Sequence, residues 1–213
     1  AAVRSAARAA AETALSALRR KISGIEADEV VMAWCRSEVA EVNDQCARAA
    51  AALTEKRFAA SIALCEQATR SLSWLLEKSE QRQLEEERRS YLVSSLIEVL
   101  RQQEFLVSDP QLARADDLDS TVVIHATRPD RRAILMQVPT SGPVSYDVDG
   151  YSRRIESGPS GPSATCDEAE ARLEAIHAQL EADFGIRMGE LQWDVFVLAW
   201  GPVRRAVRRP SCR

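Results

Sequence analysis

The sequence predicts an α+β fold, in which an N-terminal antiparallel helical hairpin with a coiled-coil-like seam precedes a small antiparallel sheet covered by one helix. Residues 1–109 contain one glycine and no proline, whereas residues 110–213 contain seven glycines and all eight prolines. Apolar residues in the first part recur at spacings of three and four, which is the period of one helical face. We therefore expect a helical region over 1–109, an α+β domain over 110–200 and a basic, disordered tail over 201–213.

An apolar seam runs along two consecutive helices of the first region. The polar segment 54–57 interrupts it, and so short a connection makes the two helices antiparallel neighbours. Such a seam packs helix against helix, within one chain or between partners. We expect it to form the protein-interaction surface of the molecule. Its members are Met32, Cys35, Val39, Val42, Cys46, Leu53, Phe58, Ile62, Cys65, Leu72 and Leu76.

Helix boundaries follow from glycine and charge positions. The first helix is expected over 2–22 and ends near Gly24, because glycine favours the left-handed C-terminal cap. Its Ala- and Arg-rich composition would suit an organellar transit peptide, but its apolar spacing favours a helix that continues from an upstream segment. The second helix is expected over 27–53. The third begins near Lys56, and the stretch 90–103 either continues it or follows a bend at the charged run 85–89.

The second region has the signals of a β-meander. Segments 120–126, 133–138 and 144–148 are strand-sized and separated by turn residues, which predicts an antiparallel arrangement. Residues 157–163 are expected to be a loop. Thr165 and Glu168 form a capping box at the start of a helix that ends at Gly185, and the apolar segment 195–200 could add an edge strand.

Few residues in the chain suit catalysis. Histidine is the usual general base near neutral pH, and the chain has only His125 and His177. Cys166, at the start of a helix, could act as a thiol nucleophile with either histidine. An isolated histidine in a strand or helix is more commonly packed or solvated, and no third group supports such a pair. We therefore expect no catalytic residues and a protein that is not an enzyme.

Metal and cofactor sites are equally poorly indicated. Asp147 and Asp149 alternate along one strand and could share a hard cation, although a solvent-facing strand edge explains them more simply. The Gly- and Pro-rich segment 157–162 precedes a helix, but its prolines lack the backbone donors that a phosphate needs. We expect no metal and no cofactor.

Cysteine usage and hydropathy bear on the compartment. None of the five cysteines forms a pair with the two-residue spacing of metal sites, and three lie on the apolar seam. We interpret them as small core residues in a reducing compartment, which favours a cytoplasmic protein. No apolar run approaches the ~20 residues of a membrane-spanning helix, so no membrane association is expected.

These observations predict a non-enzymatic protein-interaction or complex-assembly protein. Its helical hairpin would bind a partner protein or a second copy, in the manner of an adaptor. The alternative is a nucleic-acid-associated protein, because arginines crowd the C-terminus and neutralise phosphates without needing a fold. The arginines of that alternative are Arg204, Arg205, Arg208 and Arg209.

Overall fold

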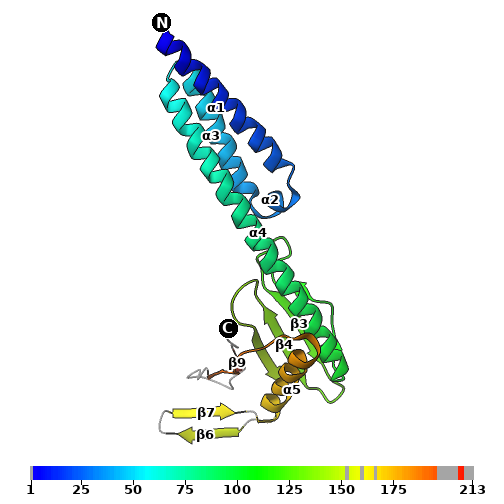
Figure 1. Cartoon of the computed structure of the whole chain (residues 1–213). Coiled ribbons are helices and arrows are strands. Elements are labelled where there is room, and N and C mark those ends of the chain that lie inside the picture. The colour runs from blue at the N-terminus through cyan, green and yellow to red at the C-terminus, as the bar shows by residue number, and fades with distance from the viewer. Residues whose placement is uncertain (1, 152–153, 159–160, 166, 196–205, 209–213) are drawn as a thin grey trace. The chain divides into compact units, whose positions relative to one another are not determined.

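The computed structural model describes residues 2–151, 154–158, 161–165, 167–195 and 206–208, and the chain divides into two compact units (Figure 1). Unit 1 comprises Ala1–Leu84 and unit 2 comprises Glu85–Arg213. The composition change near 109–110 lies later than this boundary, because the last turns of the longest helix lack glycine and proline but belong to the second core. The α+β class is confirmed.

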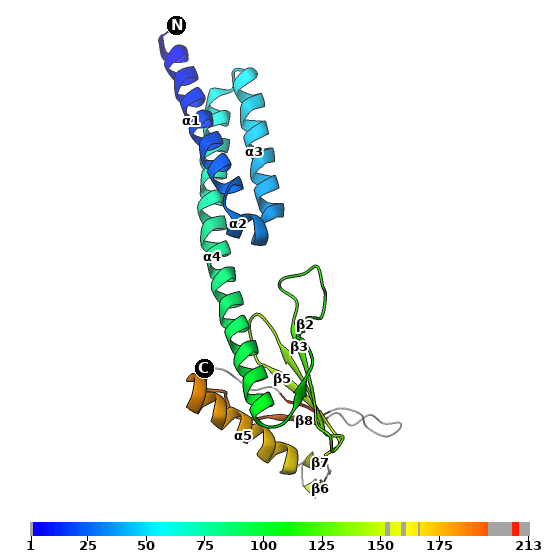
Figure 2. The same cartoon turned by 90° about the vertical axis from the view of Figure 1, so that its right-hand side faces the viewer.

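Unit 1 is helical. Its long helices lie side by side in both perpendicular views and share one apolar core (Figures 1 and 2). The last of them continues into unit 2. The elements are α1 (Ala2–Glu26), α2 (Glu29–Trp34), α3 (Arg36–Thr54) and α4 (Phe58–Gln102).

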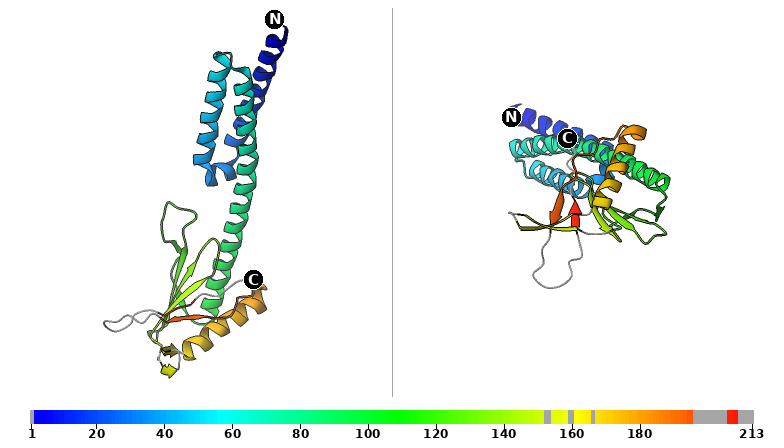
Figure 3. Two further views of the ribbon diagram at one scale, coloured as in Figure 1. Left: turned by 90° about the vertical axis from the view of Figure 1, so that its left-hand side faces the viewer. Right: turned by 90° about the horizontal axis from the view of Figure 1, so that it is seen from below.

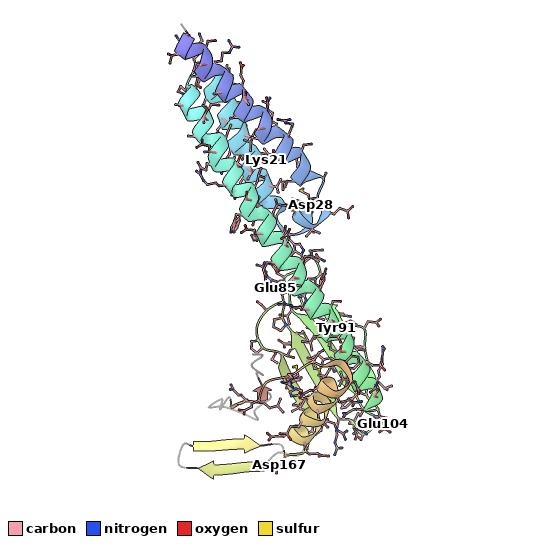
Figure 4. All side chains as sticks on the ribbon, viewed as in Figure 1. Lys21, Asp28, Glu85, Tyr91, Glu104 and Asp167 are labelled. Atoms are coloured by element: carbon pink, nitrogen blue, oxygen red, sulfur yellow. The ribbon has the colours of Figure 1, made fainter. Side chains whose placement is uncertain are left out.

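The first two helix boundaries differ from those expected. α1 continues through Gly24, so this glycine is not a C-terminal cap. The N-terminal cap of α2 is Asp28, whose carboxylate accepts hydrogen bonds of 2.9 and 3.1 Å from two backbone N–H groups of the next turn (Figure 4). A second break falls at Cys35, where φ is −132° and ψ is 26°. The single helix expected over 27–53 is therefore two helices.

The connection between α3 and α4 is a tight turn. Lys56 has a φ of +60°, and its N–H donates to the carbonyl of Leu53 over 3.0 Å. The N–H of Arg57 donates to the carbonyl of Ala52 over 2.8 Å, so the two bonds together close the end of α3. α4 then runs without interruption, and the charged run 85–89 lies inside one helix.

Unit 2 contains the predicted antiparallel meander. The three central strands pair in chain order, two short strands pair with the first of them, and two further strands extend the sheet beyond the third. The elements are β1 (Leu106–Val107), β2 (Gln111–Leu112), β3 (Val122–Thr127), β4 (Ala133–Val138), β5 (Ser145–Asp149), β8 (Trp193–Val195) and β9 (Ala206–Arg208).

One face of this sheet is buried. α5 (Asp167–Phe184) and the C-terminal part of α4 lie on the same side of the sheet (Figures 2 and 3). Ile124, Met136 and Tyr146 point from neighbouring strands into the core beneath them, and each is at most 1% exposed. Gly185, with a φ of +68°, ends α5 as predicted.

Two expectations for the second region require correction, and a third, the side-chain cap from Thr165, is untested. Residues 157–163 are not a loop, because β6 (Arg154–Gly158) and β7 (Gly161–Thr165) pair as an antiparallel hairpin. A two-stranded hairpin tolerates proline, since each strand has a free edge. α5 begins at Asp167, and a cap from the Thr165 side chain lies outside the described residues. In the tail, residues 206–208 form β9 rather than a disordered end, whereas 196–200, the rest of the expected edge strand, lie outside the described residues.

A buried guanidinium ties α4 to two loops of unit 2. Arg89 is 3% exposed and donates to the backbone carbonyls of Ser120 and Leu118, the latter over 2.8 Å. It also donates to Thr140 Oγ1 over 2.9 Å and forms an ion pair with Glu86 on the same helix. One side chain therefore satisfies the acceptors of the loop before β3 and of the β4–β5 connection.

We predict that Arg89→Met lowers the free energy of unfolding of unit 2 by about 3 kcal/mol, because buried acceptors lose their donor and Glu86 loses its partner. Hydrogen exchange of the β3 and β4 amides at increasing urea concentrations measures this change in the free energy of unfolding. The exposed neighbour Arg88 provides the control, and Arg88→Met should change the free energy by less than about 0.5 kcal/mol. Equal effects of the two substitutions would contradict the role assigned to Arg89.

Candidate interaction surfaces

The predicted seam is the internal core of unit 1. Val39 and Val42 are 2% exposed, and Leu72 is 3% exposed. α1 covers these side chains with its own apolar stripe, so the helix that packs on the seam belongs to the same chain. The buried members cannot contact another protein unless unit 1 opens. The α1 stripe consists of Leu15, Leu18, Ile22 and Ile25.

The remaining seam positions divide into buried and half-buried groups. Cys35, Cys46 and Cys65 are buried, whereas Met32 and Leu53 are only half-buried. On α4 the core-facing positions agree with the predicted ones only at Cys65 and Leu72. The expected members Phe58 and Ile62 are half-buried and Leu76 is 37% exposed, while the buried positions are Ser61, Cys65, Ala68, Leu72, Leu75 and Ser79.

Ser61 shows why the pattern on α4 was difficult to read. This serine is fully buried, and its Oγ donates to the backbone carbonyl of Ala49 on α3 over 2.9 Å. Small side chains at this level allow α3 and α4 to approach closely. A hydroxyl that satisfies its own hydrogen bond can occupy a core position, although its residue type predicts exposure.

We predict that Val42→Asp lowers the free energy of unfolding of unit 1 by about 3–5 kcal/mol, because it buries an unpaired carboxylate. Circular dichroism should show the loss of helix. Ala47→Asp, on the exposed side of α3, provides the matched control and should leave helicity unchanged. Full helicity in the Val42 variant would mean that this face is not the core.

Two of the buried cysteines, Cys35 and Cys65, have raised thiol pKa values. Burial raises the pKa of Cys35, and burial together with the neighbouring Cys46 raises the pKa of Cys65. Both residues are free thiols in the structure. Because the thiolate is the reactive form, these side chains act as small apolar core residues, in agreement with their interpretation from sequence.

The residues considered for thiol catalysis do not form a described site. His177 lies on α5, and its Nε2 is 2.9 Å from the hydroxyl of the buried Tyr146. It therefore provides a hydrogen-bond partner for a core tyrosine. His125 is exposed on β3, opposite Leu135. Cys166 lies outside the described residues, so its pairing with either histidine stays untested.

The two acidic residues considered as metal ligands lie on the third central strand of the sheet. Asp147 and Asp149 lie on β5 opposite Leu135 and Ala133. Within the part of the chain that the structure describes, no group of three or more His, Cys, Asp or Glu residues could hold a metal ion. In the same residues, no helix is long and apolar enough to cross a membrane.

The outer side of α4 in unit 1 exposes large apolar side chains. Trp74 is 54% exposed and Leu84 is 41% exposed. They lie on one stripe with Glu77 and Gln81, at successive spacings of three, four and three residues. This outer stripe (Trp74, Glu77, Gln81 and Leu84) faces away from the core stripe of α4. The outer stripe was not predicted from the sequence. The only signal for it was Trp74, which lies between the seam positions Leu72 and Leu76.

The ion pair between Lys78 and Glu38 lies beside the Trp74 ring. The Nζ of Lys78 lies 5.0 Å from the centroid of the Trp74 ring and forms an ion pair with Glu38 on α3. Hydrogen bonds from Lys78 and from the hydroxyl of Ser37 lower the pKa of the Glu38 carboxyl to about 2. The indole therefore lies beside a fixed ammonium group, which favours its present orientation.

We predict that acid weakens unit 1 through Glu38. Its pKa in the folded chain lies below the ordinary value of 4.5, so the stabilisation is fully present above pH 4.5 and is lost as the pH falls towards 2. Because both side chains are about a quarter exposed, with values of 27% and 26%, we expect a loss of about 1 kcal/mol. Thermal unfolding of wild type and Glu38→Gln at several pH values measures it. An identical pH dependence in the two proteins would contradict the assignment.

A second surface feature lies where α3 turns into α4. An open groove of about 770 Å³ is formed by one side of α1 and by the α3–α4 connection. Basic residues predominate around it, and two of its lining side chains are apolar. The lining residues are Arg4, Ser5, Arg8, Glu12, Leu53, Thr54, Lys56 and Phe58.

The arginines of the nucleic-acid alternative are mostly outside the described residues. Arg204, Arg205 and Arg209 belong to this group. Arg208 ends β9, where its backbone pairs with Trp193 and Tyr146 in the two neighbouring strands. A nucleic-acid role for these arginines therefore stays a prediction.

Comparison of the chain with protein-family models, with curated proteins and with solved structures found no match.

Proposed function

We propose that this chain is a non-enzymatic protein-interaction protein whose contact surface is the outer stripe of α4. The observation that carries the proposal is the 54% exposure of Trp74, the largest apolar side chain among those exposed on unit 1. Tryptophan is enriched among residues that dominate binding energy at protein interfaces. Leu84 provides a second apolar contact on the same stripe, and the polar residues between them would form part of a rim.

The proposal keeps an adaptor role but moves the surface from the seam to the opposite side of α4. The buried core of unit 1 supports such a scaffold, because it fixes α4 against α1 and α3. A cytoplasmic location is part of the same proposal. It is supported by the three cysteines that fill the core of unit 1 as buried thiols.

Trp74→Ala tests this function. We expect the substitution to weaken partner binding by about tenfold or more, because it removes the largest exposed apolar group of the stripe. The full chain and its variants would be used as baits in affinity capture with quantified proteins, and a captured protein would be purified for titration. Light scattering over a range of concentrations tests whether the partner is a second copy.

Leu76→Ala provides the control, because Leu76 has an exposure of 37% but lies beside the core stripe. Binding should survive in this variant and fall in Leu84→Ala. A partner that binds wild type and Trp74→Ala equally would contradict the proposal. Capture of nucleic acid that is lost at high salt and unaffected by Trp74→Ala would favour the alternative function.

A further inference from the structure

We propose that the groove at the α3–α4 connection binds an acidic peptide segment that carries an apolar side chain. This site goes beyond the proposed function, because it uses different residues of unit 1 from those of the outer stripe. Its volume of about 770 Å³ lies within the usual range of ligand pockets, roughly 300–1,000 Å³. The inference rests on two apolar lining residues, Leu53 and Phe58, that share the groove with the uncompensated positive charges of Arg4 and Lys56.

Two of the residues that line the groove are half-buried apolar side chains. Leu53 lies in the last turn of α3, and Phe58 is the first residue of α4. Leu53 packs at the edge of the unit 1 core, which holds it in place. An incoming apolar side chain would lose water against these two groups, and burying apolar surface favours association.

The charged residues that line the groove carry an excess of positive charge. Arg8 forms an ion pair of 2.7 Å with Glu12, which neutralises one of the three basic residues. Arg4 and Lys56 have no carboxylate within ion-pair distance among the residues that the structure describes. Two cations from separate elements, α1 and the α3–α4 turn, thus line the same groove as Leu53 and Phe58.

This combination fits a peptide better than a nucleic acid or a simple anion. A nucleic-acid backbone carries a dense row of phosphates, and only two cations of the groove, Arg4 and Lys56, lack an ion pair among the described residues. A small inorganic anion would leave Leu53 and Phe58 without a partner. A segment with two carboxylates around a leucine or phenylalanine would use both features of the groove, and charge complementarity would set its orientation.

Fluorescence anisotropy with the full chain tests the proposal. The probe is a short labelled peptide that alternates aspartate and glutamate with leucine, and the reference peptide replaces each carboxylate by its amide. The test protein carries Arg4→Glu and Lys56→Glu. The matched control carries Arg20→Glu and Arg70→Glu, which change the net charge equally at exposed positions outside the groove.

We expect the acidic peptide to bind wild type and the control variant, and to bind the groove variant at least about tenfold more weakly. The amide peptide should bind all three proteins weakly. Equal binding to the groove and control variants, equal binding of the two peptides, or no binding of the acidic peptide to wild type would each overturn the proposal. Trp74→Ala should not alter peptide binding, so this site and the outer stripe can fail independently.

Discussion

The packing of α1 on the α3–α4 hairpin is the contact on which unit 1 depends. The hairpin interface contains several small core residues, including Ala49, Ser61 and Ala68, and such residues bury little apolar area by themselves. α1 adds three leucine or isoleucine side chains that are at most 5% exposed, namely Leu15, Leu18 and Ile22. Each fully buried side chain of this size contributes about 1.5–3 kcal/mol of transfer free energy. The hairpin is therefore a stable scaffold only when α1 covers it.

This packing determines which side chains of unit 1 are accessible. A seam that is closed within the chain leaves only the outer surfaces of its helices for partners. The same packing that buries Leu72 and Leu75 turns Trp74 outward, because successive residues of a helix point in different directions. The ion pair between Glu38 and Lys78 then joins α3 to the part of α4 that carries Trp74. α4 therefore contributes Leu72 and Leu75 to the core of unit 1 and Trp74 to its outer surface.

Unit 2 uses a different device to order its loops. Its sheet is buried on one face by α5 and the end of α4, and hydrophobic packing accounts for that core. The segment before β3 and the β4–β5 connection lack a continuous apolar stripe, so a buried polar group holds them. Arg89 performs this role because the several donors of a guanidinium can satisfy acceptors from separate segments at once.

The sequence predicted the elements whose period was strong. The three central strands and the α5 stripe were found because their alternation and spacing are regular, and β4 was predicted at its observed bounds. The break at Cys35 was missed, since no glycine or proline marks it. β6 and β7 were missed because their composition is typical of a loop.

The candidate sites were less predictable than the fold. A three–four spacing identifies an apolar face but does not say whether a partner chain or another helix of the same chain covers it. On α4 the buried Ser61 and Ser79 also concealed the core-facing positions, so the predicted seam included the exposed Leu76. The groove was unpredictable from spacing, because Arg4 and Lys56 meet only through tertiary packing.

Hydrogen–deuterium exchange of the full chain tests most directly whether α1 closes the seam. If α1 closes the seam, the amides of 11–25 in α1, 39–53 in α3 and 61–75 in α4 should be protected to a similar degree. They should become exposed in one cooperative event. The protection should not depend on protein concentration, because the covering helix belongs to the same chain. Rapid exchange throughout α1 beside protected α3 and α4 amides, or protection that rises with concentration, would contradict it. Either result would mean that the seam is open to a partner.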